Sequence, residues 1–349
     1  MLFRSLGLVT GRVCFVRYTD VIGRKKIMLF ACGAGLVLVG IYFVPMPLVL
    51  FTVLRWAHGT AMGVVSNTLT TVGVASTPKS RFSEGVGYFS LSITVGTALG
   101  PYLGYFVLRF GTTTTVFVVA LIGTALAFLT ILATPVEEIT LSVEERKKLT
   151  QGIHIDQIIE KKALAISIIV AAIPCACYII ITNFLNNFAL EQGFYDVASL
   201  YFVVYAVCVV LFRPITGRLM DKKGDNVIMY PSLLAFAAGL AILAFCTNVW
   251  TLILVAVINA FGQGCSFSAG QAITARNLPP HRLSIASSTY FTLGDVGFSV
   301  GPVLFGLLVP IVGYSGMYLV AAGVMVLTTV IYFFAHGRKN MKPEQERDN

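Results

Sequence analysis

Two charged residues within long apolar segments have the chemistry needed to couple proton binding to movement. Asp295 lies eight residues inside the apolar run from Ser287 to Val309, and no other carboxylate falls well inside such a run. Burial disfavours the charged form of a carboxyl group, so Asp295 could load and release a proton. A nearby cation such as Arg55 would favour the charged form of Asp295 and so oppose the effect of burial. Alternate approach and separation of the two charges could therefore couple proton uptake and release to transport. The alternative is that Asp295 stays protonated and bonds a neighbouring helix.

Polar residues on other apolar runs could line a cavity. Arg55 lies about 10 Å from the end of its run at the helical rise, and burying its charge is costly, so a cavity-facing position is favoured. His58 shares its face and either lines the cavity or packs. Uncharged amides and aromatic hydroxyls suit an organic ligand, with interhelical hydrogen bonding as the competing explanation. These candidates are Tyr178, Asn183, Asn186, Tyr201, Tyr205, Asn259 and Gln263.

The composition requires a membrane protein to position these residues. The 349 residues are 56% hydrophobic and 12% charged, and the mean hydropathy is +0.83. We therefore predict an all-α polytopic membrane protein, in which the net charge of +9 reports topology and not nucleic-acid binding. The seven cysteines lie in apolar runs, so we expect neither a metal site nor a disulfide. Eleven spans are predicted: 2–18, 27–44, 48–69, 86–108, 115–134, 163–187, 197–219, 227–246, 252–272, 287–309 and 317–334.

The basic residues give the orientation of these spans. Twenty of the 25 Lys and Arg residues lie in or beside alternate connections, while the opposite turns hold one, Arg109. The positive-inside rule places the basic connections and the C-terminal tail in the cytoplasm. The predicted organisation is an N-terminal bundle at 1–134, a cytoplasmic linker at 135–162, a C-terminal bundle at 163–336 and a tail at 337–349. Ser142 to Glu145 carries a helix-capping signature, so the linker contains either a surface helix or only a solvated charged segment.

An internal repeat relates the two bundles. "RVCFVRYTDVIG" at Arg12 matches "RPITGRLMDKKG" at Arg213, and "GTALGPYLG" at Gly96 matches "GFSVGPVLFG" at Gly297, both at an offset of 201 residues. Two unrelated motifs with one offset indicate a duplication, as in transporters built from parallel repeats. The counterpart of the span 163–187 would lie before Met1. We therefore expect twelve helices in a full-length protein, the first of which is missing here.

Four motifs in this order resemble the major facilitator superfamily, and more narrowly its bacterial proton-coupled drug and metabolite efflux permeases. "DVIGRKK" is similar to the signature loop of the family, although Val16 and Val21 depart from it. "GRLMDKKGD" is the second-half copy, with Asp225 where arginine is expected. "RWAHGTAMG" resembles the fourth-helix motif, with His58 where glutamine is common, and "GTALGPYLG" the antiporter motif.

The resemblance implies roles for further residues. The signature loops imply a cytoplasmic gate, in which Asp20 and Arg24 form a charged latch, although simple orientation signalling by the basic residues is compatible. The antiporter motif forms a stripe that lets another helix approach closely. The gate residues are Asp20, Gly23, Arg24, Gly217, Arg218, Asp221 and Gly224, and the antiporter motif comprises Gly96, Gly100, Pro101 and Gly104.

Secondary active transport is the function that these features favour. We expect a monomer in the plasma membrane that exports a small organic molecule in exchange for protons and needs no cofactor. No "GK" dipeptide occurs, which disfavours an ATP-driven pump. A sugar or nutrient importer on the same fold remains open. A membrane-embedded enzyme has little support because no HExxH occurs and the four histidines are scattered.

Overall fold

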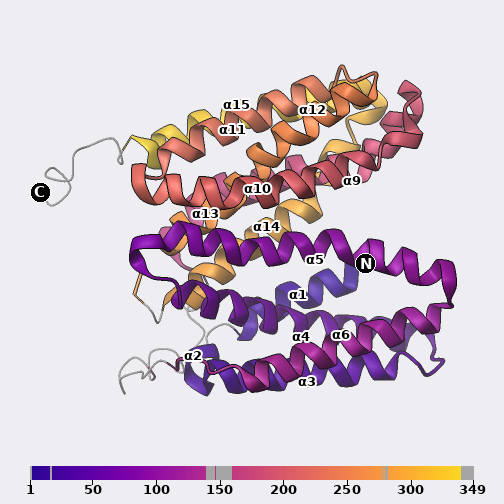
Figure 1. Ribbon diagram of the computed structural model, residues 1–349, viewed down its shortest axis with the longest axis vertical. Coiled ribbons are helices and arrows are strands. Elements are labelled where there is room, and N and C mark those ends of the chain that lie inside the picture. The colour runs from indigo at the N-terminus through magenta and orange to yellow at the C-terminus, as the bar shows by residue number, and fades with distance from the viewer. Residues whose placement is uncertain are drawn as a thin grey trace, which may run out of the picture. The chain divides into compact units, whose positions relative to one another are not determined.

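The computed structural model describes residues 2–15, 18–138, 146, 159–276, 278–279 and 282–338, all of them in helices or their connections. The helices follow one another along the chain without a strand among the described residues (Figure 1). Their bounds are α1 Leu2–Phe15, α2 Thr19–Ile22, α3 Arg24–Ile41, α4 Leu48–Ala75, η2 Lys79–Arg81, α5 Phe82–Phe110, α6 Thr113–Ala133, α8 Lys161–Ser167, η4 Ile168–Ala172, α9 Ile173–Gln192, η5 Tyr195–Val197, α10 Leu200–Lys223, α11 Asn226–Leu243, α12 Val249–Asn259, η6 Ala260–Cys265, α13 Ser266–Ala275, α14 Leu283–Gly306, α15 Val309–Tyr332 and η8 Phe333–Gly337.

The predicted spans coincide with helices. Seven helical segments of the described chain are long and apolar enough to cross a membrane: 48–75, 113–133, 163–192, 200–223, 226–243, 249–275 and 309–337. The remaining predicted spans fall on α1, α3, α5 and α14. Three basic residues in the first turn of α3 lower its hydropathy. The all-α membrane fold predicted from the sequence is therefore confirmed.

The chain forms two compact units. Unit 1 comprises Met1–Ser76, Leu99–Lys161 and Asn277–Thr292, and unit 2 comprises Thr77–Ala98, Lys162–Arg276 and Leu293–Asn349. The bundle boundaries stay a prediction. The predicted capping signature at 142–145, most of the linker around it and most of the tail lie outside the described residues.

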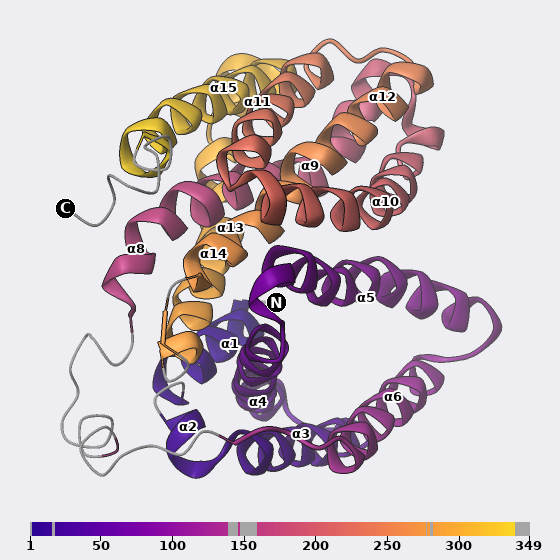
Figure 2. The same ribbon diagram turned by 60° about the vertical axis from the view of Figure 1, so that its left-hand side comes forward.

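Unit 1 is held together by a very close contact between α1 and α4 (Figure 2). Gly7 and Gly11 of α1 face Gly59 and Gly63 of α4. A Cβ atom on Gly59 would lie 2.1 Å from the carbonyl oxygen of Arg4, and one on Gly11 would lie 2.2 Å from that of Thr60. Glycines spaced four residues apart on both helices therefore let the two backbones touch. α3 packs against α4 and α6.

Unit 2 is organised around α11, which packs along α15 and also contacts α12 and η6 (Figure 1). α10 packs against α12 and η6, and α9 packs against α15. The π-helical segment η6 interrupts the α12–α13 helix between Ala260 and Cys265. Such a bulge rotates the side chains that follow it and is frequent at functional sites.

The internal repeat reappears in the contacts of two buried arginines. The Arg213 Nε atom donates to the carbonyl oxygen of Gly264 at 3.2 Å. Arg12, its repeat counterpart, donates to Ser66 Oγ at 3.4 Å, and Ser66 donates to the carbonyl oxygen of Gly63 at 3.2 Å. Gly63 and Gly264 are themselves 201 residues apart. Equivalent arginines thus reach equivalent glycines, directly in one unit and through a serine in the other.

Candidate functional site: a charge cluster and two polar clusters

The second signature motif lies against the first turn of α5 within unit 2. Asp221 accepts hydrogen bonds from the backbone nitrogens of Ser83 at 2.8 Å and Glu84 at 3.0 Å. These N–H groups have no partner within their own helix, so the Asp221 carboxylate caps α5. A Cβ atom on Gly217 would lie 2.7 Å from the Glu84 Cα atom, so glycine is required for this close approach. We refer to Ser83, Glu84, Arg218, Asp221, Asp225 and Arg276 as the charge cluster.

Glu84 binds two arginines in this cluster. The Nε atoms of Arg81 and Arg218 each lie 2.7 Å from a Glu84 carboxylate oxygen. The hydrogen bond from Arg81, followed by the one from Arg218, lowers the pKa of Glu84 to about 2. Glu84 therefore stays ionised at neutral pH and acts as a fixed negative charge.

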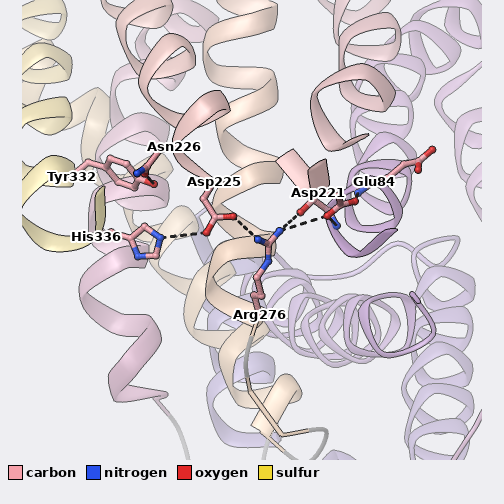
Figure 3. Close-up of polar contacts among 8 residues, drawn as sticks. Glu84, Asp221, Asp225, Asn226, Arg276, Tyr332 and His336 are labelled. Atoms are coloured by element: carbon pink, nitrogen blue, oxygen red, sulfur yellow. Dashed lines mark hydrogen bonds and ion pairs between the residues drawn. The ribbon is translucent and has the colours of Figure 1, made fainter. Parts of the chain in front are cut away.

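Arg276, at the end of α13, lies between two carboxylates (Figure 3). Its NH1 atom is 2.7 Å from Asp225 Oδ1, and its NH2 atom is 3.6 Å from Asp221 Oδ1. NH2 also donates to the hydroxyl group of Ser83. One guanidinium thus connects the ends of α10 and α13 and the start of α11 to the start of α5.

The end of the α15–η8 helix is joined to the start of α11 beside this cluster (Figure 3). His336 Nε2 lies 3.4 Å from Asp225 Oδ2. Asn226 donates to the carbonyl oxygen of Gly337 at 2.9 Å and accepts from the Tyr332 hydroxyl at 3.2 Å. Asp225 is therefore shared between Arg276 and His336.

The first signature motif makes local contacts within unit 1. Arg24 Nε donates to Asp20 Oδ1 at 2.7 Å, and both side chains are buried. Glu138 accepts hydrogen bonds from the backbone nitrogens of Arg24 at 2.7 Å and Lys25 at 2.9 Å, which caps α3. Gly23 and, in the second motif, Gly224 have positive φ angles of 108° and 87°, which favour glycine. The ion pair expected of the latch is present, while its role in gating stays a prediction.

A second cluster surrounds Arg55 in unit 1. The Arg55 guanidinium carbon lies 5.1 Å from the ring centroid of Tyr42 and 5.0 Å from that of Phe51. The Tyr42 hydroxyl lies 3.1 Å from His58 Nδ1, within hydrogen-bond distance. Arg4 and Arg55 both interact electrostatically with Tyr42 and with His58. We call Arg4, Tyr42, Phe51, Arg55 and His58 the Arg55 cluster.

A third cluster in unit 2 joins five of the predicted cavity residues. Tyr205 donates to Gln263 Oε1, and Asn259 donates to the Tyr201 hydroxyl at 3.1 Å. The Tyr178 and Tyr205 ring centroids are 5.4 Å apart, and Tyr201 stacks on Tyr205 at 6.0 Å. We call these residues the aromatic–amide cluster. Its members come from α9, α10, α12 and η6, so the structure gathers them on facing helices.

Other predicted site residues lie apart from these clusters. Asn183 and Asn186 are exposed on α9. Asp295 belongs to unit 2, where it acts electrostatically on Cys175, whereas Arg55 belongs to unit 1. The coupling role of Asp295 stays a prediction.

The two glycine stripes of the repeat differ in their surroundings. A Cβ atom on Gly301 would lie 2.5 Å from the Ala176 carbonyl oxygen, so α14 packs tightly on α9. No described atom lies within 4 Å of a Cβ atom built on Gly96, Gly100 or Gly104. The close helix approach expected at this stripe stays a prediction.

Sequence reasoning missed Glu84 and Arg276 of the charge cluster, as well as His336 beside it and Glu138 at the start of α3. Asp225 carried a signal, because it is acidic where the signature motif has arginine. The negative charge of Asp225, in place of the positive charge of arginine, allows its ion pair with Arg276.

Comparisons with known proteins give the family. The family model described as Major Facilitator Superfamily matches residues 1–230 and 193–349. An uncharacterized MFS-type transporter of Methanocaldococcus jannaschii is 22% identical over 277 residues, which are 74% of this chain and 68% of the relative. The tetracycline resistance protein, class H, of Pasteurella multocida is 28% identical over 49% of this chain and 41% of the relative. A multi-drug resistance efflux pump PmrA homolog of Lactococcus lactis is 29% identical over 42% of this chain and 36% of the relative. This chain thus matches less than half the length of the last two relatives.

Solved structures show the same fold. The human organic anion transporter MFSD10 superposes with a TM-score of 0.77 at 15% identity, over 95% of this chain and 82% of that one. The proton:xylose symporter XylE superposes with a TM-score of 0.71 at 15% identity, over 96% of this chain and 84% of the symporter. The family-model match and the relatives confirm the family that the motifs predicted. They also confirm the prediction that the protein is a transporter and not an enzyme. The chain belongs to the Major Facilitator Superfamily and is a multi-pass membrane transporter.

Proposed function

We propose that this transporter exports a small organic molecule in exchange for protons by alternating access. It acts as a monomer in the plasma membrane, with its C-terminus in the cytoplasm. Two of the relatives described above are named for drug or tetracycline resistance. The concentration of Lys and Arg in alternate connections supports the orientation.

The capping of α5 by Asp221 is the observation that carries the proposal. Its two hydrogen bonds and the Arg218–Glu84 ion pair join helices from the two halves of the repeat at the predicted cytoplasmic end. A transporter that alternates its access must break such contacts to open this end and reform them to close it. Glu84 serves as the fixed anion of this gate, because its lowered pKa prevents protonation at neutral pH. Asp20, Gly23 and Arg24 form the corresponding first-half gate.

The substrate binds at the aromatic–amide cluster in this proposal. Three tyrosine rings provide apolar surface, while the amide groups of Asn259 and Gln263 provide donors and acceptors. The Asn259 Oδ1 atom is buried without a hydrogen-bond partner in the described chain. A buried acceptor of this kind costs free energy unless a donor reaches it, and a substrate donor would do so.

Asp295 takes up and releases the coupling proton in this scheme. It lies within α14, close enough to act on Cys175 of α9. Cys175 precedes Tyr178 by three residues on the same helix, so both can face one side of α9. In this proposal the proton carrier and the substrate cluster both belong to unit 2.

Efflux from intact cells tests the proposed function. Cells that express the chain are loaded with tetracycline or a cationic dye, and retention is followed with and without an uncoupler. Uncoupler-sensitive loss of either compound, absent from vector-only cells, is the expected result. Increased accumulation would indicate an importer, and efflux that persists after collapse of the proton gradient would refute proton coupling.

A further inference from the structure

The Arg55 cluster in unit 1 combines two arginines, and the described helices around it carry no acidic residue. Arg4 and Arg55 both act on Tyr42 and His58. α1, α3, α4 and α6, which form and flank the cluster, contain no aspartate or glutamate anywhere in their sequences. No side chain of these helices can therefore neutralise the two guanidinium groups.

The aromatic contacts of Arg55 attract its charge, and within the described part of the chain its guanidinium group donates no hydrogen bond. The faces of Tyr42 and Phe51 stabilise the cation at 5.1 and 5.0 Å. An aromatic face offers no lone pair, whereas a guanidinium has five N–H donors. Arg55 is the eighth residue of α4, about 10 Å along the helix from its start. A guanidinium at that depth in an apolar environment favours an anion that accepts these donors.

The surroundings of Arg55 define the shape of the anion. A carboxylate matches the planar fork of a guanidinium and can bind it with two parallel hydrogen bonds. Phe117 extends the aromatic surface, since its ring centroid lies 6.0 Å from that of Tyr42. The Tyr42–His58 pair adds polar groups at the edge of the same surface. A compact molecule with one carboxylate and an apolar body satisfies all of these groups.

We propose that the Arg55 cluster is a binding site for a small organic carboxylate, held by Arg55 and Arg4 with its apolar body against the aromatic rings. This site belongs to unit 1, whereas the aromatic–amide cluster belongs to unit 2. The inference goes beyond the proposed function, because binding here requires neither efflux nor a proton gradient.

Tryptophan fluorescence offers a direct test, since the chain has two tryptophans. Trp56 follows Arg55 in α4, and Trp250 is 77% exposed at the start of α12. The Trp250→Phe variant therefore leaves one reporter beside the site. The protein is reconstituted in phosphatidylcholine nanodiscs and titrated with cyclohexanecarboxylate, and with cyclohexanecarboxamide as the neutral equivalent. We expect a saturable change with the carboxylate only, and none in a Trp56→Phe protein.

Three substitutions in the Trp250→Phe background identify the residues involved. Arg55→Gln should weaken carboxylate binding about tenfold or more, as expected for loss of charged hydrogen bonds, and Arg4→Gln should weaken it less. Arg55→Lys keeps the charge and should retain weak binding, which shows that the altered site is folded. Lys79→Gln removes an exposed positive charge in unit 2 and should have no effect.

Three results would overturn the inference. Equal responses to carboxylate and carboxamide would show that charge is not recognised, and unchanged affinity in Arg55→Gln would place binding elsewhere. Loss of the carboxylate response in nanodiscs containing phosphatidylglycerol would assign the site to lipid headgroups. Failure of efflux with intact carboxylate binding would refute the proposed function alone, and efflux without carboxylate binding would refute this inference alone.

Discussion

The Asp221→Asn substitution should loosen the first turn of α5 without unfolding unit 2. Asp221 accepts two backbone hydrogen bonds, at 2.8 Å from Ser83 and 3.0 Å from Glu84. Asparagine keeps one side-chain oxygen as an acceptor, but its amide nitrogen cannot accept the second bond, and the negative charge at the helix start is lost. A hydrogen bond to a charged group contributes about 1.5–3 kcal/mol. We therefore expect opening of this turn to become easier by about 2 kcal/mol.

Hydrogen exchange measures this change at the two amides concerned. A difference of about 2 kcal/mol corresponds to exchange about 30-fold faster, since each 1.4 kcal/mol is a factor of ten. The experiment compares peptides that contain Ser83 and Glu84 with peptides from α11 and α15, whose exchange should not change. Glu191→Gln, which removes an exposed carboxylate at the far end of α9, is the matched control. Unchanged exchange at Ser83 and Glu84 would refute the role of Asp221 as the cap of α5.

The same variant separates gating from substrate recognition. If the cap holds the closed gate, Asp221→Asn should slow export, while the affinity for an exported compound stays within a few fold. A large loss of affinity with normal turnover would contradict the gating role and place Asp221 in substrate recognition.

Three further predictions concern Asp295, Glu84 and Gly301. Asp295→Asn should abolish uncoupler-sensitive efflux but retain substrate binding, and normal pH-dependent efflux by this variant would exclude Asp295 as the proton carrier. The lowered pKa of Glu84 means that its ion pairs stabilise the folded state fully above its ordinary pKa of 4.5, and that this contribution is lost as the pH falls towards about 2. Protection of the α5 first turn should therefore be constant from neutral pH to about pH 5 and decline below it, and Glu84→Gln should reduce that decline. Gly301→Ala should lower the free energy of unfolding by about 1–3 kcal/mol, because the alanine Cβ atom would collide with the Ala176 backbone. Gly100→Ala should be tolerated, and equal effects of the two glycine variants in a melting experiment would contradict the packing described here.

The sequence predicted local and repeated features well. Hydropathy located the helices, since crossing a membrane requires long apolar segments. The Asp20–Arg24 ion pair was predicted from the signature motif, and it forms across the break that Gly23 makes between α2 and α3. The repeat offset related Arg12 to Arg213, and these two arginines make equivalent contacts.

Long-range partners could not be predicted in the same way. Asp221 and Ser83 are 138 residues apart, and Glu138 and Arg24 are 114 residues apart. Neither hydrophobic periodicity nor a motif specifies which helix start a distant carboxylate will cap. The aromatic–amide cluster was predicted only in part. Its residue types were recognised, but the pairing of Tyr205 with Gln263 depends on how α10 packs against η6.

The two signature motifs share a sequence pattern but perform different structural tasks. In the first motif, the Asp20 carboxylate of α2 binds Arg24 at the start of α3, and Glu138 caps α3. In the second motif, Asp221 itself caps a helix distant in sequence. Asp20 and Arg24 are both buried, so opening the first-half gate would separate two buried opposite charges, which is costly. Asp221 binds uncharged backbone N–H groups at a helix start, so releasing them separates one charge from two N–H dipoles, at lower cost. A contact that must open and close in every transport cycle needs that lower cost, so the second motif is better suited to gating.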